Sequence, residues 1–157
     1  MINIISLLAA YIIMEFVAYF SHKYIMHGFL RRWHVGHHIN DLKRPDEEVQ
    51  NNGFEQNDLF FLIFAIPAII IMILGLLTGI WILVYISAGI TLYGITYFLI
   101  HDVIYHKRIS VPFLQRNHGR YMRAILRAHH AHHKPKNKTD FESYGLLLFP
   151  KRHLKEA

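Results

Sequence analysis

The chain has 157 residues, of which 53% are hydrophobic and 18% are charged, and its formal net charge is +6. About a quarter of the residues in soluble proteins are charged, so this balance favours a membrane protein and argues against a basic nucleic-acid-binding protein. The chain contains no cysteine, which excludes disulfides, thiolate metal ligands and cysteine nucleophiles.

Residues 2–26 form the first long apolar run and predict a membrane-spanning helix, which takes roughly 20 residues. A signal peptide would carry basic residues before its apolar core, whereas here they begin only at Lys23. Glu15 and His22 interrupt the run two helical turns apart. Ionisable groups inside a span are costly and often functional. Glu15 is therefore expected either to bond a neighbouring helix or to orient a metal-binding imidazole.

Residues 28–57 are more polar and are expected to lie outside the membrane. Gly28 is the expected end of the first helix. A short surface helix with the first of two H-x-x-H-H motifs should come next. A loop should follow it, with the acidic run Asp46-Glu47-Glu48 facing water and a turn at Asn52-Gly53.

The next stretch, residues 59–100, contains no charged side chain. Its 42 residues are about twice the length of one span, which predicts a helical hairpin that turns at Thr78-Gly79. The two spans are expected at about 59–78 and 80–105.

The last third of the chain, residues 107–157, holds twelve of the 17 lysines and arginines. A helix over about 117–133 should carry the second H-x-x-H-H motif, and residues 141–150 are apolar enough to lie on the membrane or on the helices. Lysine and arginine accumulate on the cytoplasmic side of membrane proteins. Their distribution predicts an N-terminus outside, three spans, and all histidine motifs on the cytoplasmic side of the inner membrane.

Ten of the 13 histidines fall in the two H-x-x-H-H motifs and in two pairs five residues apart. In a helix, H-x-x-H-H places three imidazoles on one face. Ten neutral nitrogens are too many for one metal ion and suit two ions with about five ligands each. Without sulfur, the choice is among iron, zinc, copper, nickel and manganese. The predicted ligands are His22, His27, His34, His37, His38, His101, His106, His129, His132 and His133, while His118, His130 and His153 are expected at the surface.

The pairs His22/His27 and His101/His106 raise a geometric difficulty. Five residues along an ideal α-helix rotate a side chain by about 140° and move it about 7.5 Å along the axis, so the two rings would not converge. We therefore predict a helix end or a π-bulge within residues 22–27 and within residues 101–106.

Five stretches then stand out in chain order: His22-Lys23-Tyr24-Ile25-Met26-His27-Gly28, Trp33-His34-x-x-His37-His38, Asn57-Asp58-Leu59, His101-Asp102-x-x-x-His106 and Ala128-His129-x-x-His132-His133. Together they resemble the bacterial beta-carotene 3-hydroxylase family, within the fatty acid hydroxylase superfamily of histidine-rich, di-iron membrane oxygenases. The resemblance extends from about Met14 to Pro150. The H-x-x-H-H motifs indicate only the superfamily, and the first stretch narrows it to carotenoid hydroxylation.

The resemblance implies a non-heme di-iron monooxygenase that uses O2 and electrons from a ferredoxin-like donor. It would hydroxylate C3 of β-ionone rings and convert beta-carotene to zeaxanthin through cryptoxanthin. The histidines would hold two iron ions, and Glu15 and Asp102 could hydrogen-bond to their rings. Aromatic residues such as Tyr93, Tyr97 and Phe98 could line the substrate path, although helix packing is the favoured explanation and none is assigned to substrate binding.

The expected fold is one all-α domain, residues 1–157. It would be a membrane helical bundle of about three long helices with a cytoplasmic cap formed by residues 28–57 and 107–157. Two rival functions stay open. One is a sister oxygenase, namely a carotenoid ketolase, fatty acid hydroxylase or sterol desaturase. The other is a non-enzymatic metal-binding membrane protein, although a transporter would need polar residues along residues 59–100.

Overall fold

The computed structural model describes residues 1–42, 54–135 and 141–155. Within these ranges every regular element is helical, which confirms the predicted all-α class. The acidic run at residues 46–48 and the turn predicted at Asn52-Gly53 lie outside the described residues.

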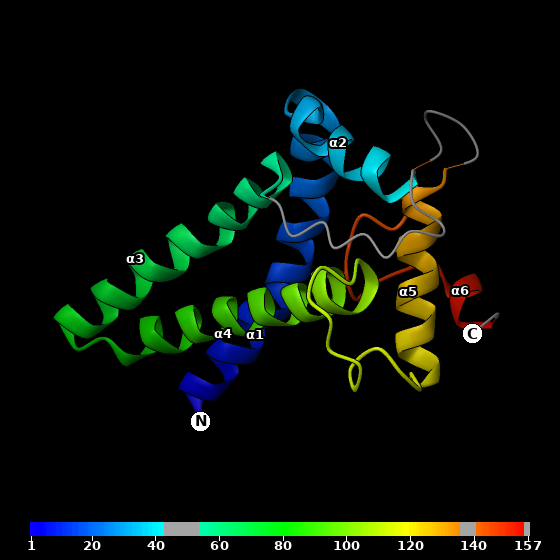
Figure 1. The fold of residues 1–157 in the computed structure, drawn as a ribbon. Helices are drawn as coiled ribbons and strands as arrows, with labels where there is room; N and C mark the ends of the chain where they lie inside the picture. The colour runs from blue at the N-terminus through cyan, green and yellow to red at the C-terminus, as the bar shows by residue number, and fades with distance from the viewer. Residues whose placement is uncertain (43–53, 136–140, 156–157) are drawn as a thin grey trace.

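Three long helices form the body of the molecule (Figure 1). Each is long and apolar enough to cross a membrane, and together they account for Ile2–Phe29, Gln56–Thr78 and Trp81–Tyr105, with 28, 23 and 25 residues. Many of their outward-facing isoleucines, leucines and phenylalanines are exposed. Such a surface suits lipid rather than water, so the chain is a membrane protein.

Each long helix is built from two segments. The first joins α1 (Ile2–Phe20) to the π-helix η1 (Ser21–Phe29). The second joins the 3₁₀ segment η2 (Gln56–Phe61) to α3 (Leu62–Thr78), and the third joins α4 (Trp81–Tyr97) to the π-helix η3 (Phe98–Tyr105).

The hairpin between α3 and α4 turns at Gly79, as predicted. Gly79 has a φ of 71°, in the left-handed region, which glycine adopts at helix ends at little cost. On the other side of α4, the backbone of Gly89 packs directly against α1, where an added Cβ would collide with the carbonyl oxygen of Leu7. The turn at Gly79 and the close approach at Gly89 place α4 between α3 and α1.

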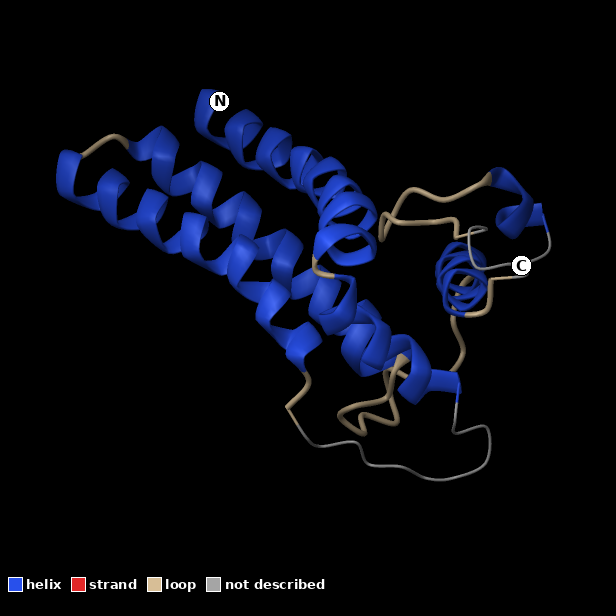
Figure 2. Ribbon diagram, turned by 90° about the horizontal axis from the view of Figure 1, so that it is seen from above, coloured by secondary structure: helices blue, strands red, loops and turns tan. Residues whose placement is uncertain are grey.

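The cap lies at the end of the long helices opposite the Gly79 turn (Figures 1 and 2). It contains α2 (Arg31–Leu42), α5 (Arg120–His133) and the short α6 (Lys151–Lys155). As predicted, the chain breaks helical geometry at Gly28 before entering α2.

Helix α5 begins three residues later than the predicted start at residue 117. Asn117 has a φ of 52°, a left-handed conformation that cannot be part of a right-handed helix. Gly119 is in an extended conformation and forms the N-cap.

The hydrophobic core connects the bundle to the cap. Its buried members come from α1, α3, α4, η3, α5 and the segment at residues 141–150, and they are Met14, Ala18, Phe64, Tyr93, Ile100, Ile125 and Leu146. The segment at residues 141–150 therefore packs on the helices, one of the two positions expected for it.

Candidate metal centre

The structure brings the predicted histidines together in two adjoining clusters. We call them the first and second histidine groups. Within each group every histidine offers one ring nitrogen, and these nitrogens all lie within 4.8 Å of one another. The first contains His22, His27, His34, His38 and His132, and the second contains His37, His101, His106 and His133. His129, the tenth predicted residue, lies beside the second group, with its Nε2 3.3 Å from Nε2 of His106.

The π-helices explain how residues five apart converge. A π-helix closes its turn over five residues rather than four, so His22 and His27 return to the same face of η1. Their ring centroids are 5.1 Å apart. In η3 the second pair is formed by His101 and by His106, the residue that caps the helix, and their ring centroids are 4.5 Å apart. The predicted helix distortions are confirmed at both places.

The H-x-x-H-H motifs do not act as undivided triads. In α2, His34 and His38 belong to the first group, while His37 belongs to the second. In α5, His132 and His133 are likewise divided. Each motif therefore reaches both groups and ties them together.

The ring nitrogens of the first group face one another at the spacing of metal ligands. Nε2 of His34 lies 3.0 Å from Nε2 of His22 and 2.9 Å from Nε2 of His38. Nε2 of His27 lies 3.0 Å from Nε2 of His132. Two nitrogens about 2.1 Å from one ion and 90° apart would be about 3 Å from each other.

The hydrogen bonds of the outer ring nitrogens decide what the inner ones can do. Nδ1 of His22 donates to the carbonyl oxygen of Tyr144 at 2.9 Å, and Nδ1 of His34 donates to Oδ1 of Asn57 at 2.6 Å. A neutral imidazole has one N–H, so both Nε2 atoms present lone pairs. Two lone pairs cannot hydrogen-bond to each other, and a cation between them removes the conflict. These residues therefore fit a bound metal ion.

Three further rings are oriented in the same manner. Nδ1 of His132 donates to the carbonyl oxygen of Glu142 at 2.7 Å, and Nδ1 of His37 donates to Oε2 of Glu55 at 3.1 Å. Nδ1 of His101 lies 3.3 Å from Oδ1 of Asp102, the contact predicted for this carboxylate. Outer contacts of this kind fix the tautomer and orientation of metal-binding histidines.

Burial keeps the cap histidines neutral. It lowers the pKa of His34 and of His132 to about 2, well below the ordinary value of 6.5, and neighbouring histidines add to the effect for His132. Burial also lowers the pKa of His37, His38 and His129. Neutral imidazole is the form that binds metal. In addition, Nε2 of His37 and Nδ1 of His38 are buried with no hydrogen-bond partner in the described part of the chain.

Glu15 forms hydrogen bonds with Tyr93 and with backbone amides, and these differ from the predicted hydrogen bond to a histidine ring. Its carboxyl oxygens accept hydrogen bonds from the Tyr93 hydroxyl and from the backbone N–H groups of Leu147 and Leu148. The bonds reach a neighbouring helix, as one of the two predictions had it, and also the segment at residues 141–150.

The three histidines expected at the surface differ from one another. His130 is exposed and His118 is partly exposed. The prediction for His153 is wrong, because this residue is buried and its Nε2 lies 3.2 Å from Oε1 of Glu142.

An apolar cavity of about 910 Å³ lies between α3 and α4 and reaches the second histidine group. Its walls include Tyr97 and Phe98, two of the aromatic residues considered from the sequence, and His101 and Asp102 lie at its edge. Tyr93 is fully buried and bonded to Glu15, which makes it a core residue. Most of the remaining lining is apolar and includes Phe60, Phe64, Ala68, Ile69, Ile90 and Ile95.

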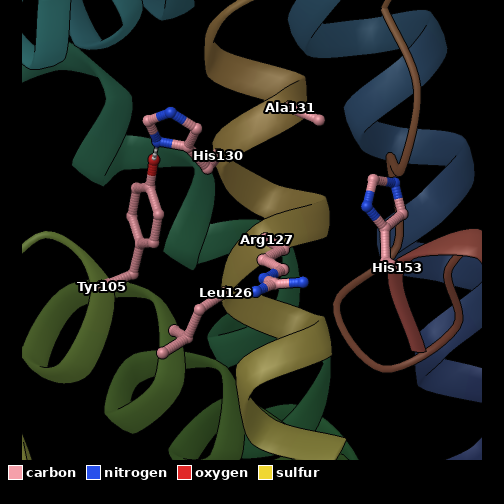
Figure 3. A pocket seen from close by; sticks show the side chains of 6 residues that line it. All are labelled: Tyr105, Leu126, Arg127, His130, Ala131 and His153. Atoms are coloured by element: carbon pink, nitrogen blue, oxygen red, sulfur yellow. Dashed lines mark hydrogen bonds between the residues drawn. The ribbon is translucent and has the colours of Figure 1, made fainter. Parts of the chain in front are cut away.

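A second pocket, of about 490 Å³, lies against α5 on the outside of the cap (Figure 3). Figure 3 shows His130 turned toward Tyr105, whose hydroxyl is 3.3 Å from Nδ1 of the histidine. The ring of Tyr105 also packs at 4.4 Å from the ring of His129. The side chain of Tyr105 thus lies between the outer surface and the second histidine group.

Sequence reasoning missed the outer partners of several rings. Asn57 stood in one of the five stretches without an assigned role, and Glu55 lies two residues before it. The carbonyl groups of Glu142 and Tyr144 had no possible signal, because every residue has a carbonyl and only the fold selects these two.

Comparisons with known proteins agree with this geometry. Residues 7–150 match the model of the fatty acid hydroxylase family. The chain is 38% identical to the beta-carotene hydroxylase of Pantoea ananas, over 87% of this chain and 71% of that protein. It is 33% identical to the beta-carotene hydroxylase of a Paracoccus species, over 96% and 86%.

A chloroplastic beta-carotene hydroxylase of Capsicum annuum is 35% identical over 88% of this chain and 41% of its own length. No solved structure matches the chain. The family match and the similarity to most of the length of the bacterial relatives lead to one conclusion: the chain belongs to the fatty acid hydroxylase family, as a membrane hydroxylase with two histidine clusters.

Proposed function

We propose that the protein is a beta-carotene 3-hydroxylase that converts beta-carotene to zeaxanthin through cryptoxanthin. The observation that carries this proposal is an apolar cavity whose lining includes His101, a member of the second histidine group, with the first group adjoining the second. The names of the relatives in Pantoea and Paracoccus supply the substrate class.

The proposed ligands are the nine histidines of the two groups together with His129. An all-nitrogen donor set in two adjoining groups suits two iron ions, which when bound would supply activation of O2 and hydroxylation at C3. The protein's own part is to hold the imidazoles neutral, to orient them through the oxygen partners of their Nδ1 atoms, and to exclude water by burial.

The cavity between α3 and α4 is the proposed position of the substrate. Its lining offers aromatic and branched aliphatic side chains along most of its wall and polar groups at the histidine end. A polyene with a terminal β-ionone ring has no polar group to satisfy, so an apolar wall suits its whole length. The ring would then point toward His101.

The proposed orientation places the histidine groups on the cytoplasmic side of the inner membrane. The cap carries most of the lysines and arginines, whereas the Gly79 turn at the other end has none. We also propose that residues 1–157 work as one domain, since core residues of the spans and of the cap pack together.

A ferredoxin-like protein is the proposed electron donor. The exposed cations of α5, α6 and the adjoining loops would attract an acidic partner. They are Arg116, Arg120, Arg123, Arg127, Lys134, Lys151, Arg152 and Lys155. The pocket beside Tyr105 lies among them and is the proposed docking point.

The direct test is expression of the chain in a host that accumulates beta-carotene, followed by chromatography of the pigments. Zeaxanthin, with cryptoxanthin as the intermediate, is the expected product. A ketone at C4 would instead assign a ketolase, and unchanged beta-carotene in the presence of membrane-inserted, metal-loaded protein would exclude both activities.

A further inference from the structure

Glu15 is a buried carboxyl group in the middle of an apolar helix, with 4% of its surface exposed. Such a group is costly in a membrane span unless it is hydrogen-bonded. Oε1 accepts from the backbone N–H groups of Leu147 at 2.9 Å and Leu148 at 2.8 Å, and Oε2 accepts from the hydroxyl of Tyr93 at 2.7 Å. Glu15 therefore connects α1 to α4 and to the segment at residues 141–148.

The same segment supplies two of the oxygen partners of the first histidine group. The carbonyl oxygen of Tyr144 accepts from Nδ1 of His22, and that of Glu142 accepts from Nδ1 of His132. Only two residues separate Tyr144 from the amide of Leu147 held by Glu15. A displacement of the amides bound by Glu15 would therefore also displace the carbonyl groups that bind Nδ1 of His22 and Nδ1 of His132.

The segment also covers the first histidine group with aromatic rings. The ring of Phe141 lies 4.4 Å from that of His27, and the ring of Tyr144 lies 5.3 Å from that of His132. These contacts exclude water from one side of the group. The position of the segment thus affects both the direction of the imidazoles and their shielding.

Gly145 reveals how closely Glu15 and the segment approach. A Cβ added at this position would collide with Oε1 of Glu15. The close approach permits the two bonds to the following amides, while the buried side chain of Leu146 packs in the core. The segment is therefore held against α1 by three features: the absence of a side chain at Gly145, the two backbone hydrogen bonds to Glu15, and the packing of Leu146 in the core.

We propose that Glu15 is a positioning residue for the first histidine group, which it reaches through the backbone at residues 142–148. This inference rests on the proposed function only in taking that group as a metal site. Glu15 touches neither metal nor substrate in this role. It sets where two carbonyl groups lie, and these set the tautomer and direction of His22 and His132.

The test compares Glu15→Met with Glu15→Gln in the full-length, detergent-solubilised protein stripped of metal. Methionine has a similar length but accepts no hydrogen bond at this position, whereas the carbonyl oxygen of glutamine can still accept from both amides. The probe is cobalt(II), added in a titration that is followed by its visible absorption, with bound metal per chain measured in parallel. Gel filtration verifies that each variant is folded and monodisperse.

The wild type should bind two cobalt ions. In Glu15→Met one of the two should bind roughly 10–100-fold more weakly, the usual effect of losing an outer partner of a metal-binding histidine. The glutamine variant should remain close to the wild type. Hydrogen exchange at the amides of Leu147 and Leu148 should accelerate only in the methionine variant.

Gly145→Ala provides a second test in which the carboxyl group remains. The added Cβ should displace the segment from Glu15 and weaken the same cobalt site. The double variant Glu15→Met/His132→Ala should bind the weakened ion no worse than His132→Ala alone, because both changes act on one group.

Two results would overturn the proposal. One is wild-type affinity for both ions in Glu15→Met and Gly145→Ala, and the other is equal weakening of both ions, which would indicate a general loss of structure. A wild-type protein that binds fewer than two cobalt ions would instead contradict the proposed metal centre itself, so the two failures are distinguishable.

Discussion

The rings of His38 and His133 stack at a centroid distance of 4.3 Å, although the two residues belong to different histidine groups. They come from α2 and α5, which reach the site from separate parts of the chain. The two groups are therefore in direct ring contact, and a displacement of His38 in one group is expected to move His133 in the other.

Replacement of His132 by alanine should abolish hydroxylation. His132 is fully buried, and its Nε2 faces that of His27 at 3.0 Å. Pigment analysis of the producing host should show beta-carotene without zeaxanthin, while the variant remains in the membrane fraction. The matched control is His118→Ala, which removes a partly exposed imidazole outside both histidine groups and outside the pocket beside Tyr105, and it should leave zeaxanthin formation intact.

Asn57→Leu should weaken the first group without removing a ligand. The change deletes the acceptor for Nδ1 of His34 and frees the ring to rotate or change tautomer. Metal affinity and activity should fall roughly 10–100-fold. Asn57→Asp retains an acceptor oxygen and should restore most of both, and equal defects in the two variants would contradict this role.

The stability of the metal-free protein should fall as the pH is lowered below 6.5. Burial lowers the pKa of His34 and of His132 to about 2, so the unfolded chain binds protons between pH 6.5 and 2 that the folded chain does not. Each such histidine costs about 1.4 kcal/mol of unfolding free energy per pH unit in this window.

Thermal unfolding of chelator-treated protein between pH 8 and pH 5 would measure this loss. The curve should be flat above about pH 7 and fall below 6.5. In His34→Gln the slope of the unfolding free energy against pH should decrease by the contribution of one proton. A midpoint temperature that does not change with pH would contradict the assignment of neutral buried rings.

Gly94 offers a way to fill the substrate cavity without touching the histidines. It lines the cavity, and an added Cβ would have nothing within 4 Å. Gly94→Phe should raise the KM for beta-carotene or abolish turnover, with bound metal unchanged. Gly94→Ala adds little volume and removes a helix-weakening glycine, so it should behave like the wild type.

The proposed donor contact at α5 should depend on salt. Reduction by an acidic ferredoxin should slow as ionic strength rises, because exposed charges are screened over about 10 Å at 0.1 M salt. Arg127→Glu should raise the KM for the donor and leave the KM for the carotenoid unchanged. Arg127→Lys preserves the charge and should have little effect, and an unchanged donor KM in the glutamate variant would place the contact elsewhere.

The general plan of the molecule could be predicted because it follows from local rules. The length of the uncharged run at residues 59–100 predicted the helical hairpin, and Gly79 predicted where it turns. The five-residue spacing of His22 and His27 predicted a helix distortion, which the structure contains as a π-helix. Helix geometry relates these residues to their immediate neighbours, so their positions are visible in the sequence.

The division of the H-x-x-H-H motifs and the outer partners of the rings could not be predicted in this way. Whether His37 joins His34 or His101 depends on how α2 packs against η3, which is a contact between distant parts of the chain. The role of Glu142 depends on its backbone carbonyl, and the burial of His153 depends on the turn that brings it to Glu142. Such features exist only after the helices have packed.

The cavity between α3 and α4 has walls that include Ile69 and Ile95, side chains that also belong to the exposed surface of the spans. Substrate and product would consequently exchange sideways with the bilayer rather than through water. Turnover should then follow the mole fraction of carotenoid in the surrounding lipid. Dilution of the pigment with inert phospholipid should slow the enzyme even when the total carotenoid concentration of the sample is constant.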